Sequence, residues 1–243
     1  MRKVLGKKAL VLFSSGQDSM TSYFWAQKNF EEVEAVFFDY GQRHLVEWTT
    51  AMAFADRENL KLNKVDLSFL TALNQNALTS SDTEINLTGG FNSLPSTFVP
   101  GRNIFFLSIA ASYALPRDIS HVVTGVCQTD YSGYPDCRED FIQSIQKTLS
   151  LGIGAPLKIH TPLMHLTKAE TFQLADDLGI LARVLSESHT CYRGLRDQLW
   201  SWGYGCDDCP ACELRKKGFF EFMESKNIST TIQEEKECHR ASC

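Results

Sequence analysis

Short apolar runs alternate along the chain with longer segments in which apolar residues recur every three or four positions. Buried strands give the first pattern and amphipathic helices give the second. The predicted strands are residues 8–13, 33–39, 61–67, 121–126 and 157–160, and the predicted helices are residues 18–29, 45–60, 103–115, 137–151 and 168–178. Because strands and helices alternate, the sequence predicts an α/β fold with a doubly wound, mostly parallel sheet that binds ligands beyond the carboxyl ends of its strands.

The turn after the first predicted strand is the densest candidate for an anion site. Residues 14–19 read Ser-Ser-Gly-Gln-Asp-Ser, and small residues ahead of a helix let backbone N–H groups approach a phosphate. No lysine follows Gly16 at the spacing of a G-x-x-x-x-G-K-S/T loop, so a kinase-type transfer of the γ-phosphoryl group is not favoured. The turn indicates pyrophosphate binding, although six such residues also fit a helix cap without a ligand.

Other loops at strand ends and helix starts carry groups that suit a nucleotide or a polar ring. Residues 39–44 hold an acid, a tyrosine and two cations. Arg102 follows a Pro-Gly turn, and Lys168 starts a helix, so either cation can reach a phosphate. Residues 124–138 contain two tyrosines and two aspartates. The tyrosine rings can stack on a heterocycle, and the aspartates can hydrogen-bond to its edge. Taken singly, each also fits an ordinary turn with solvated charges.

Composition and charge narrow the class of protein. The 243 residues carry a net charge of −5, which argues against the broad basic surface of a non-specific nucleic-acid binder. The N-terminal apolar run is too short for a signal peptide, and the stretch 104–115 is too short to span a bilayer. We therefore expect a cytoplasmic protein with small-molecule substrates, no membrane association and no direct nucleic-acid partner. We also expect one domain, with residues 1–190 forming the α/β part and residues 191–243 a metal-binding subregion packed against it.

Eight cysteines in a cytoplasmic chain indicate reduced thiols or metal ligands rather than disulfides. Four of them, Cys191 and the run Cys206-x-x-Cys209-x-x-Cys212, are enough for a tetrahedral all-thiolate zinc site. An iron–sulfur cluster is the alternative, but the fourth cysteine of the ferredoxin run is missing because residue 216 is a lysine. Four thiolates leave zinc no open position, so we predict one structural zinc ion per chain without a catalytic role.

Together the motifs resemble those of a known group of enzymes. The turn at 14–19 is similar to the S-G-G-x-D-S loop of the N-type ATP pyrophosphatases, or PP-loop enzymes, which release pyrophosphate and adenylate their substrate. Nearly the whole chain resembles the 7-cyano-7-deazaguanine synthase family. That resemblance rests on residues 12–19, 38–44, 98–103, 130–138, 161–163 and 168–170 and on the four cysteines.

The resemblance implies an adenine nucleotide alpha hydrolase-like fold and an ATP-dependent carbon–nitrogen ligase of queuosine biosynthesis. Such an enzyme adenylates the carboxylate of 7-carboxy-7-deazaguanine and lets ammonia displace AMP to give an amide. A second ATP then drives dehydration of the amide to the nitrile, which is 7-cyano-7-deazaguanine (preQ0). The resemblance also implies a homodimer, ATP bound with Mg²⁺, and zinc on Cys191, Cys206, Cys209 and Cys212.

The site residues that the resemblance implies form three groups. The ATP-binding loop comprises Phe13, Ser14, Ser15, Gly16, Gln17, Asp18, Ser19, Met20, Thr21, Ser22 and Tyr23. The substrate-binding residues are Tyr40, Gln42, Arg43, Asp130, Tyr131, Ser132, Tyr134, Asp136 and Arg138. The catalytic residues are Asp18, Ser19, Lys168 and Arg102, which would stabilise charge on the departing pyrophosphate.

Two features depart from the family pattern. Ser15 replaces the first glycine of the loop, which is harmless only if the backbone φ is negative there or the site tolerates a Cβ atom. The segment between Cys191 and Cys206 is longer and more aromatic than expected, since residues 199–204 read Leu-Trp-Ser-Trp-Gly-Tyr. This segment is predicted to form a lid, a dimer contact or an exposed patch.

Two other functions fit parts of the sequence. A PP-loop enzyme that adenylates a different carboxylate, deazapurine or tRNA substrate has the same ATP loop, and the loop at 130–138 is what argues against it. A zinc-ribbon nucleic-acid-binding module accounts for the four thiols, for Trp200 and Trp202, and for the basic residues 215–217. The acidic net charge weighs against that module.

Overall fold

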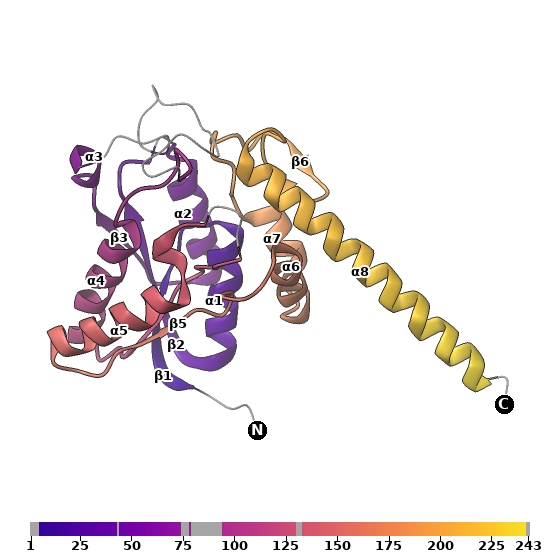
Figure 1. The fold of residues 1–243 in the computed structure, drawn as a ribbon, viewed down its shortest axis with the longest axis horizontal. Helices are drawn as coiled ribbons and strands as arrows, with labels where there is room; N and C mark the ends of the chain where they lie inside the picture. Colours follow the sequence, from indigo (N-terminus) through magenta and orange to yellow (C-terminus); the bar gives the residue numbers. More distant parts are fainter. Residues whose placement is uncertain (1–4, 43, 74–77, 79–93, 130–132, 242–243) are drawn as a thin grey trace.

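A five-stranded parallel sheet forms the centre of the protein, with the strand order β3-β2-β1-β4-β5 (Figure 1). This computed structural model describes residues 5–42, 44–73, 78, 94–129 and 133–241. The strands are β1 Gly6–Leu12, β2 Phe30–Asp39, β3 Leu62–Asp66, β4 His121–Val123 and β5 Lys158–His160. The strand order reverses at β1, and the predicted α/β class with a doubly wound parallel sheet is confirmed.

Helices follow the strands in the predicted alternation, and further elements complete the C-terminal part. The helices are α1 Gln17–Asn29, α2 Val46–Glu58, α3 Leu70–Leu73, α4 Arg102–Ala114, α5 Glu139–Ile153, α6 Lys168–Asp177, α7 Leu181–Glu187 and α8 Pro210–Ala241. Two 3-10 turns, η2 Leu115–Arg117 and η3 Pro135–Cys137, precede β4 and α5. A separate hairpin joins β6 Leu199–Trp200 to β7 Gly203–Tyr204.

The two faces of the sheet build two separate apolar cores. Successive residues of a strand point to opposite faces, so Ala9 and Val11 pack with side chains of α1, α2 and α6–α8, whereas Leu10 and Leu12 pack with α4 and α5. Both faces are therefore covered, which explains why the central strands read as continuous apolar runs. In Figure 1, α4 and α5 lie on the side of the sheet away from α6, α7 and α8.

The reversal of strand order at β1 brings the loops after β1 and β4 together at the carboxyl edge of the sheet. Gly125 lies where the loop after β4 passes the start of α1. A Cβ atom there would stand 2.9 Å from the carbonyl carbon of Asp18 and 3.0 Å from its oxygen, so this approach requires glycine. The predicted strand 121–126 accordingly ends at Val123, because the chain turns toward α1 beyond it.

The C-terminal part contains elements that the hydrophobic pattern did not predict: α7, the β6–β7 hairpin and α8. The strands of the hairpin have only two residues each, too few to show an alternating pattern. The first turns of α8 pack along α6, where Phe172 meets Phe219 with ring centroids 5.4 Å apart. Figure 1 shows the later turns of α8 extending away from the body toward the C-terminus.

Candidate active site

The loop between β1 and α1 closes on itself through two serines. The Ser14 N–H donates to Ser19 Oγ at 3.2 Å, and Ser19 Oγ donates to the Gly16 carbonyl at 3.0 Å. No side chain caps α1 at Gly16. Because the first N–H groups of a helix attract anions, the loop has the form of a phosphate cradle.

Ser15 adopts a left-handed backbone conformation, with φ of 63°, and its side chain is fully buried. The condition that φ be negative at this position is therefore not met. The Cβ atom is accommodated instead, because Ser15 Oγ donates to the Glu47 carbonyl at 2.9 Å. The Ser15 carbonyl accepts from the His189 N–H, also at 2.9 Å. The substituted position thus ties the loop to α2 and to the segment after α7.

Asp18 and Lys168 form an ion pair across 150 residues of sequence. Lys168 Nζ lies 3.1 Å from Asp18 Oδ1 and 2.9 Å from Asp18 Oδ2. Lys168 is the first residue of α6, whose start is fixed by a capping box between Thr167 and Glu170. The lysine side chain is only 10% exposed, so the pair is partly shielded from water at the start of both helices.

A cavity of about 290 Å³ lies beyond the carboxyl ends of β1, β2 and β4. It is lined by ten of the predicted site residues, namely Phe13, Ser14, Gly16, Gln17, Asp18, Ser19, Tyr40, Gln42, Arg102 and Tyr134. It is also lined by residues for which no role was predicted, including Glu47, Phe106, His189, Thr190 and Tyr192. Glu47 could have been found only as an acid near the start of a predicted helix. No local motif marked Phe106, His189, Thr190 or Tyr192.

Several predicted residues lie outside the lining of this cavity. Met20, Thr21, Ser22 and Tyr23 are buried inside α1, below the loop rather than in it. Asp136 accepts from the Asn103 N–H at 3.1 Å and so holds the start of α4, while Arg138 precedes α5 as its N-cap. The predicted residues Arg43, Asp130, Tyr131 and Ser132 lie outside the part of the chain that the structure describes.

Arg102 lies between two tyrosine rings at one end of the cavity. Its guanidinium carbon is 5.9 Å from the ring centroid of Tyr40 and 5.9 Å from that of Tyr134. Tyr134 is held in turn by a 2.6 Å hydrogen bond between its hydroxyl and that of Thr97. Rings on both sides fix the plane of the guanidinium, a geometry that suits recognition of a carboxylate or a phosphate.

Glu47 lies in the first turn of α2 and lines the same cavity. Burial raises the pKa of its carboxyl group to about 7, against the opposing effects of a hydrogen bond from Gln42 and the charge of Arg102. Gln42 is itself fixed, because its Oε1 accepts from the Tyr40 N–H at 2.9 Å and its Nε2 donates to the Phe38 carbonyl at 3.1 Å. The cavity therefore holds a carboxyl group that titrates near neutral pH.

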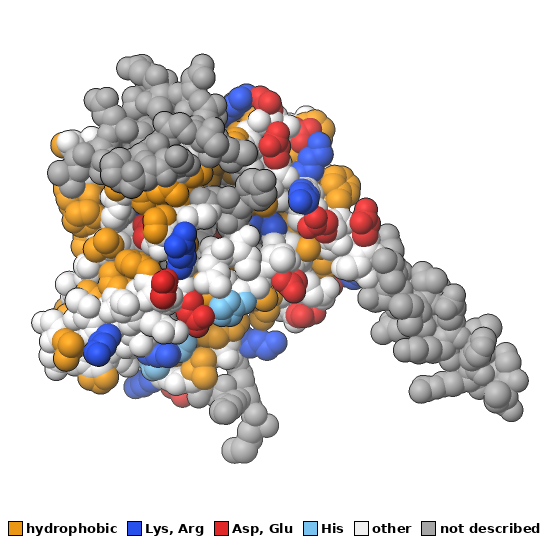
Figure 2. Space-filling view, viewed as in Figure 1, with side chains coloured by type: hydrophobic (Ala, Val, Ile, Leu, Met, Phe, Trp, Pro, Cys, Tyr) orange, Lys and Arg blue, Asp and Glu red, His pale blue; other side chains and the backbone are white. Residues whose placement is uncertain are grey.

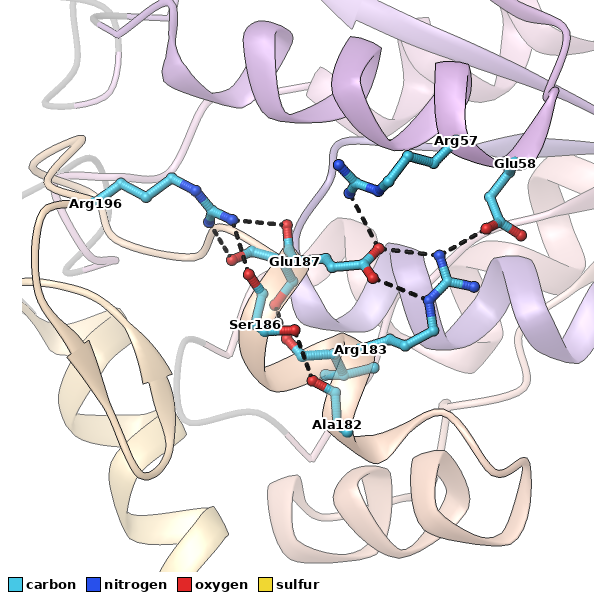
Figure 3. Close-up of polar contacts among 9 residues, drawn as sticks. Arg57, Glu58, Ala182, Arg183, Ser186, Glu187 and Arg196 are labelled. Carbon is cyan, nitrogen blue, oxygen red and sulfur yellow. Dashed lines mark hydrogen bonds and ion pairs between the residues drawn. The ribbon is translucent and has the colours of Figure 1, made fainter.

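The segment 188–192 carries three of the lining residues and is anchored by a polar network (Figure 3). Arg196 donates to the carbonyl oxygens of Ser188 and Glu187 at 2.6 and 3.1 Å, which satisfies the C-terminal end of α7. Arg183 bridges Glu187 and Glu58 at 3.0 and 2.6 Å and so joins α7 to α2. These bonds fix the end of α7, and with it the start of the segment beside the loop.

Cys191, Cys206, Cys209 and Cys212 come together in a second site. One sulfur atom from each lies within 4.8 Å of the others, and Cys206 Sγ and Cys212 Sγ are 3.8 Å apart. Sulfur atoms at the corners of a tetrahedron with metal–sulfur bonds of about 2.3 Å are separated by about 3.8 Å. The cluster therefore has the donor set and the dimensions to bind one metal ion, with three of its four cysteines buried.

Arg215 connects the cysteine cluster to the cavity. Its side chain is 1% exposed and donates to the Trp202 carbonyl at 2.9 Å, the Val184 carbonyl at 3.0 Å and the Thr190 hydroxyl at 3.0 Å. Thr190 lines the cavity, and its hydroxyl also faces the N–H of Gln17 at 3.5 Å. The buried guanidinium thus joins the hairpin and α7 to the segment beside the PP-loop.

Within the described residues, no helix combines the length and the apolar character needed to cross a bilayer. Figure 2 shows basic and acidic side chains interspersed on this face rather than gathered into one basic patch.

A Ser-x-Gly-x-Asp-Ser loop that joins β1 to α1 at the switch point of a parallel sheet, with a lysine from a later helix paired to its aspartate, defines the class of PP-loop nucleotide-binding proteins. The particular family follows from the sequence comparisons. The model of the family described as "Queuosine biosynthesis protein QueC" matches residues 8–223. The chain belongs to the QueC family.

Two curated relatives are similar over nearly their whole length. A 7-cyano-7-deazaguanine synthase of Bacillus subtilis (strain 168) is 50% identical over 220 residues, covering 90% of this chain and 97% of that protein. A 7-cyano-7-deazaguanine synthase of Staphylococcus haemolyticus (strain JCSC1435) is 48% identical over 222 residues, covering 91% of this chain and 96% of that protein. The NH3-dependent NAD synthetase of Campylobacter jejuni, a solved structure, reaches a TM-score of only 0.42 at 18% identity over 73% of this chain and 66% of its own, so the family assignment rests on sequence.

Proposed function

We propose that this chain is an ATP-dependent 7-cyano-7-deazaguanine synthase of queuosine biosynthesis. It converts 7-carboxy-7-deazaguanine and ammonia to the nitrile through an adenylated carboxylate and an amide. The observation that carries the proposal is that the PP-loop with Asp18 and the ring-flanked Arg102 line one cavity, while Lys168 is paired with Asp18. The relatives that match nearly end to end support the same reaction.

The loop end of the cavity is assigned to ATP. The backbone N–H groups at the start of α1 and the hydroxyls of Ser14 and Ser19 would hold the pyrophosphate, with Mg²⁺ accompanying the nucleotide. Lys168 supplies a positive charge beside Asp18, which orients the lysine or the metal. A carboxylate becomes a good acyl donor only when its oxygen leaves as AMP, so stabilising charge on the leaving pyrophosphate is the main task of these groups.

The opposite end of the cavity is assigned to the deazaguanine. Tyr40 and Tyr134 present aromatic faces, and Arg102 between them suits the carboxylate that is to be activated. We keep Arg43, Asp130, Tyr131, Ser132 and Arg138 as proposed substrate contacts, and Asp136 as the residue that holds Asn103 at the start of α4.

The cysteine cluster is assigned a structural zinc ion. An all-thiolate tetrahedral site closes around zinc with no open position, and its donors need a reducing compartment such as the cytoplasm. The spacing of 3.8 Å between two sulfurs favours a single ion over an iron–sulfur cluster, which needs more room between its ligands. Bound zinc would fix Cys191 at the end of the segment 188–192 and so stabilise the wall of the cavity. We treat residues 1–190 and 191–243 as one domain, because α6 and α8 share a core.

We also propose that the protein is a homodimer. Leu199 and Trp200 of the β6–β7 hairpin are 48% and 39% exposed, and Trp200 stacks on the buried Trp202 with centroids 6.2 Å apart. An ordered apolar surface of this kind suits a contact between subunits. The molar mass from light scattering tests this directly.

The experiment that tests the proposed function supplies purified protein with ATP, Mg²⁺, ammonium and 7-carboxy-7-deazaguanine and measures AMP and products by mass spectrometry. We expect AMP together with the amide and then the nitrile. AMP without a deazaguanine product would move the activity to another carboxylate substrate, and no AMP with any deazaguanine acid would refute the proposal. A salt titration of tRNA binding serves as a control, because salt-sensitive binding would favour a nucleic-acid module.

A further inference from the structure

The cavity contains two carboxylates among its described lining residues, Asp18 and Glu47, and their surroundings differ. Asp18 is paired with the ammonium group of Lys168 through both of its oxygens. Glu47 accepts a hydrogen bond from the neutral amide of Gln42 and feels Arg102 through its charge. Two acids whose environments differ in this way are suited to different chemical roles.

The position of Glu47 is fixed on both sides. Its own carbonyl accepts from Ser15 Oγ at 2.9 Å, which anchors the first turn of α2 to the PP-loop. The orientation of the Gln42 amide is set by the Tyr40 N–H on its oxygen, so its Nε2 faces the Phe38 carbonyl and the Glu47 carboxyl. Glu47 therefore lies between the nucleotide end and the deazaguanine end of the cavity, held by neutral donors.

The charged and titratable groups around Glu47 leave it free to change its protonation state. Arg102 faces it from α4 and Tyr40 from the end of β2, while Asp18, His189 and Tyr134 line other walls of the cavity. Burial raises the pKa of Tyr40 to about 12, so this phenol stays neutral near pH 7. A base is most effective when it titrates near the working pH.

We propose that Glu47 is the catalytic base of the nitrile-forming step, an assignment that rests on the proposed function. In that step the amide oxygen bonds to the α-phosphorus of ATP, the bond to pyrophosphate breaks, and one N–H proton passes to solvent water to give an O-adenylated imidate. Glu47 then takes the remaining N–H proton. The N–H electron pair becomes the third carbon–nitrogen bond, and the carbon–oxygen bond breaks to release AMP and the nitrile.

The test compares Glu47→Gln with Asp56→Asn, an exposed acid on the same helix, in single turnovers that start from the purified amide with ATP and Mg²⁺. Glutamine keeps the size of the side chain and can still accept from Gln42, so the fold and the affinity for ATP should be retained. We expect Glu47→Gln to form nitrile about 100-fold or more slowly at saturating amide, with KM unchanged. We expect the rate of the wild type to rise with pH around pH 7, and we expect Glu47→Gln to lose this rise while Asp56→Asn keeps it.

A second variant keeps the proposal testable if glutamine disturbs folding. Glu47→Asp retains a carboxyl group one methylene shorter and should retain both a measurable nitrile rate and the wild-type form of pH dependence. Nitrile formation by Glu47→Gln at the wild-type rate, or a rise in KM with an unchanged maximal rate, would overturn the role as base. Failure of the wild type to make AMP and nitrile refutes the proposed function instead, so the two failures are distinguishable.

Discussion

Replacing Ser15 by glycine and by alanine separates the strain in its backbone from the hydrogen bond made by its hydroxyl. An L-residue in the left-handed region costs about 1–2 kcal/mol, and Ser15 occupies that region with φ of 63°. Glycine removes this cost but loses about 0.5–1 kcal/mol through its greater freedom in the unfolded chain. Both substitutions lose the bond to the Glu47 carbonyl, which contributes about 1 kcal/mol.

These magnitudes give a clear order of stability. Ser15→Ala keeps the strain and loses the hydrogen bond, so its free energy of unfolding should fall by about 1 kcal/mol. Ser15→Gly loses both the backbone strain and the hydrogen bond, so the two effects largely offset each other. Its free energy of unfolding should lie within about 0.5 kcal/mol of that of the wild type. For a chain of 243 residues, a difference of about 1 kcal/mol corresponds to about 2–4 °C in melting temperature.

The assay is urea unfolding followed by circular dichroism, with ATP affinity measured on the same three proteins. Equal slopes against urea would show that only the stability has changed. We expect Ser15→Gly to bind ATP as the wild type does, because the backbone of the loop is unchanged. If Ser15→Ala is as stable as Ser15→Gly or more so, Ser15 does not hold a left-handed conformation in solution and the reasoning fails.

Three further predictions concern the ion pair, the cysteine cluster and a histidine pair. Asp18→Ala should lower AMP formation by about 100-fold or more without changing metal content, and normal turnover would exclude the loop from catalysis. Cys209→Ser should lose the bound metal. With free metal at a thousandfold excess over its dissociation constant, this loss should lower the free energy of unfolding by about 4 kcal/mol. Full metal content by mass spectrometry would contradict the assignment of the four cysteines as metal ligands. Burial, then the charges of His121 and Lys158, lowers the pKa of His160 to about 4. The same histidine in the unfolded chain titrates near 6.5. The stability that the neutral His160 ring contributes is therefore fully present above about pH 6.5 and is lost as the pH falls toward 4. His160→Gln should make the free energy of unfolding depend less on pH between about pH 4 and 6.5. The slope should fall by less than about 1.4 kcal/mol per pH unit, because the ring is partly open to solvent. An unchanged slope would refute the assignment.

Much of the architecture could be predicted from the sequence because it depends on residues that are close together in the chain. The run Ala9-Leu10-Val11-Leu12 must be buried on both sides, which requires a central strand of a covered sheet. The small residues of the next turn fit a helix start and an anion. The C-x-x-C-x-x-C spacing predicts metal ligands, and the Sγ positions of Cys206, Cys209 and Cys212 are close enough to act as such.

The predictions were weakest in the C-terminal part and in α1. The helix period places Met20 and Tyr23 on the apolar side of α1, but it does not predict that Thr21 and Ser22 are buried as well. The hairpin at 199–204 is held by the packing of Trp202 and by Arg215, whose guanidinium would meet a Cβ atom at Gly203 at 2.2 Å. Neither constraint has a local signature in the sequence.

The α/β class, the anion-binding turn and three of the thiol ligands can be predicted from the chain alone, since each depends on residues a few positions apart. Which distant groups meet depends on how the whole chain folds. The tertiary structure paired Asp18 with Lys168, set the left-handed φ of Ser15, and brought Cys191 to the other three cysteines. It also placed Glu47 beside Gln42 and Arg102. The pKa of a carboxyl group and the strain of a backbone depend on burial and long-range packing, which no short stretch of sequence specifies.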